Sequence, residues 1–188
     1  MAKLSGASTV LIADIDAGRV QYATDNGFAT QGLVVTRPLL NGHVTEKLEC
    51  AKDIANDMIE RLESEDDDIE GADVTFDCTG KEICMQAGFF TTRPGGKMVM
   101  VGMGTPIQTL QMSTAHLREV DIIGIFRYAN TYPTGIKILS SGVLPSLDKM
   151  VTHRFSGLEG AKDAFELASR TKDDDGNLVL KVVIELNS

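Results

Sequence analysis

The sequence is short of the residue types that mark several classes of protein. It contains no tryptophan and only three cysteines, and aromatic residues make up 5% of its 188 residues. The odd number of cysteines and the absence of CxxC spacing argue against a disulfide framework and favour reduced thiols. No apolar run reaches the roughly 18 residues that cross a bilayer. No signal-like leader opens the sequence, so we expect a cytoplasmic protein without membrane partners.

Positive charge is also scarce. Eighteen Lys and Arg residues stand against 27 Asp and Glu residues, which gives a formal net charge of −9. A surface this acidic repels phosphate backbones, so nucleic acid is excluded as a partner. The hydrophobic share of 43% is that of an ordinary globular protein, and we expect residues 1–188 to form one domain.

Short apolar runs alternate with helical patterns along the sequence. Runs typical of buried parallel strands cover residues 10–14, 32–36, 74–78, 97–101, 121–126 and 178–186. Helices are predicted over residues 17–27, 45–62, 82–91, 133–141 and 158–169, and the acidic run 63–68 indicates a solvated loop. This alternation predicts the α/β class, with a Rossmann-like parallel sheet and flanking helices.

Ligands of open parallel sheets bind where the carboxyl ends of strands meet loops, so the residues that follow each run carry the functional prediction. Asp14 ends the first run and could accept both ribose hydroxyls of an adenosine; it could equally cap the next helix. Arg19 could stack on an adenine ring, or it could be a solvated helix arginine.

Two later strand ends carry glycines, and a third carries an arginine. Thr79-Gly80 and Gly102-x-Gly104 would let a ligand approach the backbone closely, although a tight turn explains the second pair equally well. The run Phe126-Arg127-Tyr128 places a guanidinium fork directly after an apolar strand, where it suits hydroxyls, carboxylate or phosphate. A surface ion pair is the alternative for Arg127.

Metal and nucleophile chemistry have little support. His43, His116 and His153 are scattered, and the sequence has no HxxxH or CxxC frame of the kind that builds a zinc site. Cys78 ends a strand, but no histidine stands beside it in sequence, so we interpret it as a small buried hydrophobe.

Several motifs together resemble one family. VLIADIDAGR, FDCTG, TTRPGGKMVMVGMG, REVDIIGIFRYANTYP, SGV and VTHRF occur in this order and spacing. They resemble the medium-chain, zinc-type dehydrogenases, and within these the polyol branch of sorbitol, xylitol and L-arabinitol dehydrogenases. The resemblance runs from about Ala2 to Leu186.

The resemblance implies a role for each matching residue. Asp14 matches the acid that binds the adenosine ribose and favours NAD, and Arg19 matches the arginine near the adenine. Thr79 lies in the loop that the cofactor passes. The matches that meet the nicotinamide end are Val101, Gly102, Met103, Phe126 and Arg127, and those that touch the polyol are Arg127 and Tyr128.

The resemblance also implies parts that the sequence does not contain. Residues 1–188 hold no GxGxxG turn and no counterpart of the family's zinc ligands, so we expect no zinc here and a weakened hold on NAD. We expect a truncated dinucleotide-binding domain whose strand 178–186 would belong to the absent catalytic domain. In the order 3-2-1-4-5-6 the absent strand is central. Its place could be closed by pairing of the first and third runs, or filled by residues 179–184 or by a second subunit, so we expect a homo-oligomer.

Three functions fit these features. The first is the cofactor part of an NAD-dependent polyol dehydrogenase, which transfers hydride from a secondary alcohol and is impaired in this truncated chain. The second is a zinc-independent enzyme that acts on another small molecule. The third is a non-catalytic interaction or scaffold subunit that pairs through the edge near residues 121–126.

Overall fold

The computed structural model describes residues 1–35, 42–63 and 70–186, and these fall into two compact units. Unit 1 comprises Met1–Val20 and Ala29–Arg127, and unit 2 comprises Gln21–Phe28 and Tyr128–Ser188. Apart from the end of a helix at Glu63, the acidic run 63–68 predicted as a loop lies outside the described residues.

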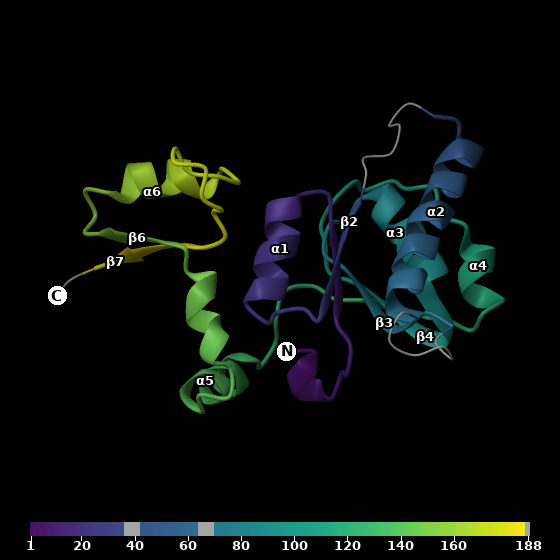
Figure 1. Ribbon diagram of the computed structural model, residues 1–188, viewed down its shortest axis with the longest axis horizontal. Helices are drawn as coiled ribbons and strands as arrows, with labels where there is room; N and C mark the ends of the chain where they lie inside the picture. Colours follow the sequence, from purple (N-terminus) through teal and green to yellow (C-terminus); the bar gives the residue numbers. More distant parts are fainter. Residues whose placement is uncertain (36–41, 64–69, 187–188) are drawn as a thin grey trace. The chain divides into compact units, whose positions relative to one another are not determined.

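Seven strands and six α-helices alternate over the described residues (Figure 1). The strands are β1 (Leu11–Asp14), β2 (Gln31–Val34), β3 (Ala72–Asp77), β4 (Thr92–Met100), β5 (Asp121–Gly124), β6 (His153–Ser156) and β7 (Val182–Glu185). The helices are α1 (Ala17–Asp25), α2 (Val44–Glu63), α3 (Glu82–Thr91), α4 (Met112–His116), α5 (Tyr132–Ser140) and α6 (Ala161–Ala168), with 3-10 turns at Lys3–Ser5 and Pro145–Met150. Every strand pairing is parallel, which confirms the predicted α/β class.

The strands form three separate sheets: β1–β2, β3–β4–β5 and β6–β7. Two predicted ways of closing the central gap are therefore wrong in this structure. The first run does not pair with the third, since among the described residues β1 is paired with β2 and β3 with β4. Residues 179–184 do not fill the gap either, because β7 pairs with β6 across the α6 crossover.

Unit 1 has its core beneath α2 and α3. The apolar positions of α2 recur at helical spacing, and Ala51, Ile54 and Ala55 are buried as that pattern predicts. Ala51 and Ile54 pack with Ala87 of α3. A second cluster joins α3 to β4, with Phe89 and Met98 at its centre. The helix α2 packs on β1 and β2, and the helix α3 packs on β3 and β4.

Among the described residues α2 is the longest helix, with 20 residues, and its mixed polar pattern fits a surface helix. None of the helices among the described residues has both the length and the apolar character needed to cross a membrane.

Unit 2 contains β6, β7, α5, α6 and residues 21–28. Tyr22 donates a hydrogen bond to the Lys149 carbonyl and stacks on Phe28 with ring centroids 6.5 Å apart. The strand predicted over residues 178–186 begins only at Val182, because residues 172 and 178 form an antiparallel bridge first. The predicted helix 158–169 begins at Ala161 for a similar reason, since residues 157–160 form a turn.

Asp173 holds the turn before β7. Its Oδ1 accepts hydrogen bonds from the backbone N–H groups of Asp175 and Asn177 at 3.0 and 2.7 Å. Its Oδ2 lies 3.3 Å from Nε2 of His153 in β6 and 2.9 Å from the Asn177 amide nitrogen. These donors, the Asn177 side chain first, favour the charged carboxylate and lower the pKa of Asp173 to about 2.

This lowered pKa predicts acid sensitivity in unit 2. Because the folded pKa lies below the ordinary carboxyl value, the stabilisation is complete above that value and is lost as the pH falls through about 2. We expect the protection factors of the β6 and β7 amides, which compare the observed exchange rate with the intrinsic rate at the same pH, to fall between pH 4 and pH 2. In Asp173→Asn the exchange should be faster at pH 5 and the acid-dependent step smaller; a step of unchanged size would contradict the assignment to Asp173.

Candidate functional site

Asp14 ends β1 and is held by two donors. Its Oδ1 accepts a hydrogen bond from the Asp16 backbone N–H at 2.9 Å and an ion pair from Arg19 Nη2 at 2.7 Å. Asp16 in turn caps α1 by accepting the Arg19 backbone N–H at 3.0 Å. Both bonds fall on Oδ1, so among the described residues Oδ2 is the carboxylate oxygen left for a ligand hydroxyl.

Arg19 is a partner of Asp14 as well as a predicted neighbour of the adenine. The hydrogen bond to Asp14 is the main cause that raises the pKa of the Arg19 guanidinium, and partial burial opposes it. Arg19 Nε is buried without a hydrogen-bond partner within the described part of the chain. The Arg19 side chain therefore fixes the Asp14 carboxylate through Nη2, while its Nε–H donates no hydrogen bond within the described part of the chain.

Asp77 holds the loops that follow β3 and β4 by hydrogen bonds. The sequence analysis did not predict this role. The side chain is 5% exposed, and its carboxylate accepts Thr79 N–H at 3.0 Å, Thr79 Oγ1–H at 2.7 Å and Gly80 N–H at 2.9 Å. Its backbone carbonyl accepts the N–H groups of Val101 and Gly102, both at 2.9 Å. The available signal was an acid at the end of an apolar strand followed by Thr-Gly, which is typical of a carboxylate that binds the next backbone amides.

Glycines let these two loops touch through their backbones. A Cβ on Gly102 would lie 2.2 Å from Gly80 N, and one on Gly104 would lie 1.9 Å from Gly80 O. Gly80 itself has a φ of +64°. The loop is fixed further by Gln108, whose Nε2 donates to the Gly80 carbonyl at 2.9 Å. The result is a rigid backbone surface whose edge presents the exposed side chains of Val101 and Met103.

Cys84 lies in the first turn of α3, after the carboxyl end of β3. Burial is the main cause that raises the pKa of the Cys84 thiol, and the hydrogen bond with Thr79 lowers it. The charges of Asp77 and Asp14 also raise the pKa of Cys84, so both carboxylates act on the same thiol. Asp14 ends β1 and Thr79 follows β3, so each lies just after the carboxyl end of a strand, the kind of position that the strand-end argument considers.

Phe126 and Arg127 follow β5 with strained backbone at the arginine. Arg127 has a φ of +55°, a left-handed conformation that non-glycine residues rarely adopt and that clusters at functional sites. Its guanidinium lies 5.1 Å from the centre of the exposed Phe126 ring. No ion pair to Arg127 occurs among the described residues, so the charge faces solvent.

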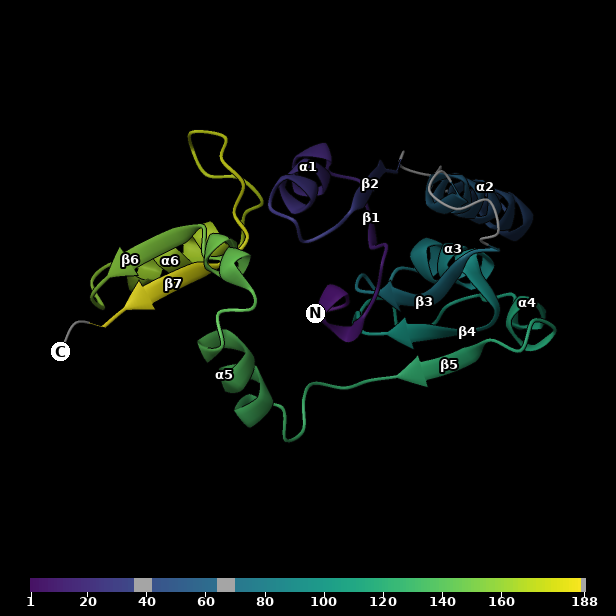
Figure 2. The same cartoon turned by 60° about the horizontal axis from the view of Figure 1, so that its bottom comes forward.

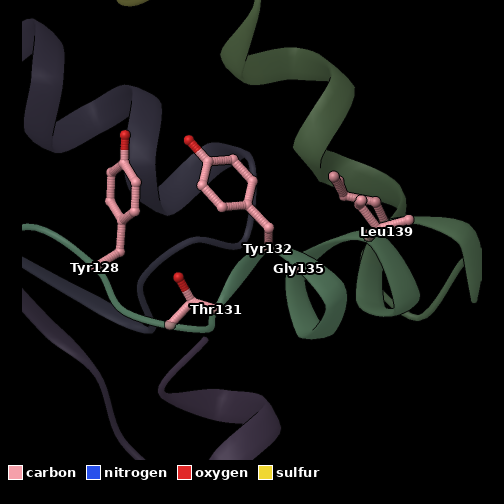
Figure 3. A pocket seen from close by; sticks show the side chains of 6 residues that line it. Tyr128, Thr131, Tyr132, Gly135 and Leu139 are labelled. Atoms are coloured by element: carbon pink, nitrogen blue, oxygen red, sulfur yellow. The ribbon is translucent and has the colours of Figure 1, made fainter.

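Tyr128 belongs to unit 2, where it meets a second tyrosine. Its ring lies edge-on to that of Tyr132, with centroids 5.1 Å apart and an interplanar angle of 87° (Figure 3). Their hydroxyl contact is the main cause that raises the pKa of Tyr132. Together with Thr131, Gly135 and the apolar side of α5 they line a shallow concavity of about 230 Å³, below the roughly 300 Å³ of ordinary small-molecule sites.

A zinc site does not fit the described residues. No group of three or more His, Cys, Asp or Glu side chains gathers closely enough there to hold a metal ion. His153 contacts Asp173 and Thr152, and His116 contacts the Met112 carbonyl, so these two histidines have structural partners. All three cysteines are free, and Cys78 is exposed where the sequence suggested a buried residue.

Comparison with known proteins identifies the family. The family model described as zinc-binding dehydrogenase matches residues 1–141. The chain belongs to the zinc-binding dehydrogenase family. Sorbitol dehydrogenase of Gallus gallus is 37% identical over 172 residues, which cover 90% of this chain and 42% of that protein. Sorbitol dehydrogenase of Rattus norvegicus is 36% identical over 187 residues, which cover 98% of this chain and 44% of that protein.

Solved structures agree with this family. A dehydrogenase of unknown specificity from Escherichia coli superposes with a TM-score of 0.69 at 26% identity, over 100% of this chain and 46% of that one. L-Idonate 5-dehydrogenase from Escherichia coli has a TM-score of 0.69 at 21% identity, over 98% of this chain and 45% of that one, and shows the shared fold. The family resemblance and the Rossmann-like fold are both confirmed. The chain spans less than half the length of these dehydrogenase relatives.

Proposed function

We propose that this chain is the coenzyme-binding part of an NAD-dependent polyol dehydrogenase. The proposal rests on the carboxylate of Asp14, which lies at the carboxyl end of β1. Arg19 and the Asp16 backbone N–H both donate to its Oδ1, so Oδ2 is the oxygen that would accept a ribose hydroxyl. A carboxylate fixed before the ligand arrives forms charge-assisted hydrogen bonds without losing further side-chain entropy.

The glycine-lined loops fit the rest of the coenzyme. Gly80, Gly102 and Gly104 bring the backbones of the two loops into direct contact, so the loops that would lie along the coenzyme are held together. Thr79, Val101, Met103 and Phe126 would lie along the coenzyme, and Arg127 with Tyr128 would meet the polyol hydroxyls. In such an enzyme NAD supplies the acceptor for a hydride that leaves a secondary alcohol carbon.

On this proposal, residues 1–188 alone would not carry out efficient polyol oxidation. The described residues provide no zinc ligands, so we derive no metal-dependent step from them. The chain covers 44% of rat sorbitol dehydrogenase, and polyol turnover would need groups outside this span. We therefore propose weak NADH binding and impaired polyol oxidation for the isolated chain, in a homo-oligomeric, cytoplasmic setting consistent with its free cysteines.

Titration with NADH, followed by nicotinamide fluorescence, tests the proposal. We expect saturable binding by the unaltered chain. Asp14→Ala should weaken it by about 1–3 kcal/mol, which is roughly 5- to 150-fold, because a charge-assisted hydrogen bond to the ribose is lost.

Asp73→Ala is the matched control. Asp73 also pairs with an arginine in unit 1, at 2.8 Å from Arg93 Nη2, but at the opposite end of its strand and on the surface. Its loss should leave NADH affinity unchanged. Equal affinities of the Asp14→Ala variant and the unaltered chain would remove Asp14 from the site, and absence of binding at millimolar NADH would overturn the proposal for the isolated chain.

A further inference from the structure

The helix α3 holds one residue of the segment between β4 and α4 by both of its main-chain groups. Thr109 donates its backbone N–H to Oε2 of Glu82 at 2.7 Å, and its carbonyl accepts a hydrogen bond from Nε2 of Gln86 at 2.6 Å. Glu82 and Gln86 are four residues apart on α3, so their side chains lie on one face of the helix. We call these two bonds the Thr109 clamp.

The Thr109 clamp joins the segment to the helix layer of unit 1. The helix α3 lies between α2 and the sheet β3–β4–β5, and it also contacts α4 (Figure 2). The second carboxylate oxygen of Glu82, Oε1, lies 3.6 Å from Nζ of Lys47 in α2. Both side chains are partly exposed, and an ion pair of this kind contributes little. The bond to Thr109 is therefore the contact to which we assign the role of Glu82.

The segment that the clamp holds, residues 101–109, follows the carboxyl end of β4. Its first residues are fixed by backbone bonds to the end of β3. In its middle, the Thr105 N–H donates to the Gly80 carbonyl at 3.2 Å. Gln108 Nε2 donates to the carbonyls of Gly80 and Thr105, both at 2.9 Å. Because Gln108 directly precedes Thr109, the clamp also sets the position from which Gln108 reaches these carbonyls.

Gln86 occupies a place that stability alone does not favour for a polar residue. Its side chain is 2% exposed, and its Oε1 is buried without a hydrogen-bond partner within the described part of the chain. A buried amide oxygen left unpaired costs free energy, and an apolar side chain of similar size avoids that cost. The residues on either side, Met85 and Ala87, are buried and apolar. What Gln86 adds over such a residue is the donor to the Thr109 carbonyl.

We propose that Glu82 and Gln86 are positioning residues for the nicotinamide end of the coenzyme and act through the backbone of Thr109. This role rests on the proposed function, in which Met103 would lie along the coenzyme. The Met103 side chain is 85% exposed, so the bonds that anchor its segment, rather than packing of the side chain, determine where it lies. Asp14, at the adenosine end, belongs to the separate β1–β2 sheet and does not depend on the clamp.

Gln86→Met tests this role, because methionine fills a similar volume and cannot donate a hydrogen bond. Its NADH affinity should fall about three- to tenfold, the scale of one lost hydrogen bond. The midpoint of urea unfolding should stay unchanged or rise, because the unpaired oxygen is removed. Affinity for ADP-ribose, which lacks the nicotinamide, should be unchanged when measured by titration calorimetry. Equal weakening of NADH and ADP-ribose, or a lower urea midpoint with the same relative loss of both, would overturn the positioning role.

Two variants of Glu82 separate the acceptor from the charge. Glu82→Gln keeps an oxygen that accepts the Thr109 N–H, so its NADH affinity should stay close to that of the unaltered chain. Glu82→Ala removes the acceptor, so its NADH affinity should fall as in Gln86→Met. Lys47→Met removes only the ion pair to Glu82 and is the matched control, with unchanged affinity expected. Equal losses in Glu82→Gln and Glu82→Ala would assign the effect to the charge and contradict the clamp.

Amide exchange without any ligand keeps this inference distinct from the proposed function. In Gln86→Met and Glu82→Ala the amides of Thr105 and Thr109 should exchange about tenfold faster, whereas that of Gly102, which is bonded to the end of β3, should change little. Unchanged exchange at Thr105 would show that the clamp does not hold the segment. NADH binding that no variant alters would reject the positioning role and leave the coenzyme site in place. Binding of neither NADH nor ADP-ribose by the unaltered chain would reject the proposed function, and the role of the clamp at the coenzyme with it.

Discussion

Gly80→Ala is expected to lower the free energy of unfolding of unit 1 by about 2–5 kcal/mol, the combined scale of left-handed backbone strain and overpacking. The added Cβ would lie 2.2 Å from Gly104 N and 2.7 Å from Gly102 O, and both are backbone atoms that cannot rotate away. The residue also has a φ of +64°, which disfavours alanine independently of space. Urea unfolding followed by far-ultraviolet circular dichroism measures the loss, and NADH affinity should fall with it because the two loops must separate.

Gly95→Ala separates strain from crowding. Gly95 has a φ of +69°, almost that of Gly80, but nothing lies within 4 Å of an added Cβ. Its substitution should therefore cost only the strain, about 1–2 kcal/mol. If the two variants were equally stable, the close approach of the β3 and β4 loops would not be a determinant of stability.

Phe89→Ala is expected to destabilise unit 1 by about 3–5 kcal/mol, the range for removing a buried phenylalanine and leaving a cavity. Phe89 is 2% exposed and packs with Met85, Met98, Ala115 and Val120, so α3, β4 and the segment before β5 all lose contacts. The same urea experiment measures this loss.

Phe165→Ala is the comparison for that variant. Phe165 lies on α6 and is 75% exposed, so its removal should change the free energy of unfolding by about 0.5 kcal/mol or less. A loss below about 1 kcal/mol for Phe89→Ala would mean that the core between α3 and β4 collapses into the space, since the cavity is the main source of the expected cost.

Helices with a strong pattern were predictable from sequence, and strand partners were not. The spacing of apolar residues predicted a helix over 45–62, and α2 covers Val44–Glu63. The strand β6 was missed because four residues of alternating burial, His153–Ser156, are too few for a pattern to emerge. The division into separate sheets depends on contacts between distant segments, which no local periodicity encodes.

The candidate site shows the same contrast. Asp14 was predicted as a ligand contact because the carboxyl end of a parallel strand is a predictable place for a ligand, while its ion pair with Arg19 of α1 was not predicted. Asp77 was predictable only in part: an acid followed by Thr-Gly at a strand end indicates a carboxylate that binds the next amides, but it does not show that the Asp77 carbonyl also holds the loop after β4. The contact of Tyr128 with Tyr132 was also missed, since it depends on how the chain turns into α5.

The distribution of tyrosine gives this protein an optical asymmetry. Tyr22, Tyr128 and Tyr132 all belong to unit 2, and the sequence has no tryptophan. Tyrosine emission therefore comes from unit 2 alone, and unit 1 contributes no tyrosine or tryptophan signal. A melting curve recorded by tyrosine emission and one recorded by backbone ellipticity will coincide only if the two units unfold together, so the unaltered chain carries its own label for measuring their cooperativity.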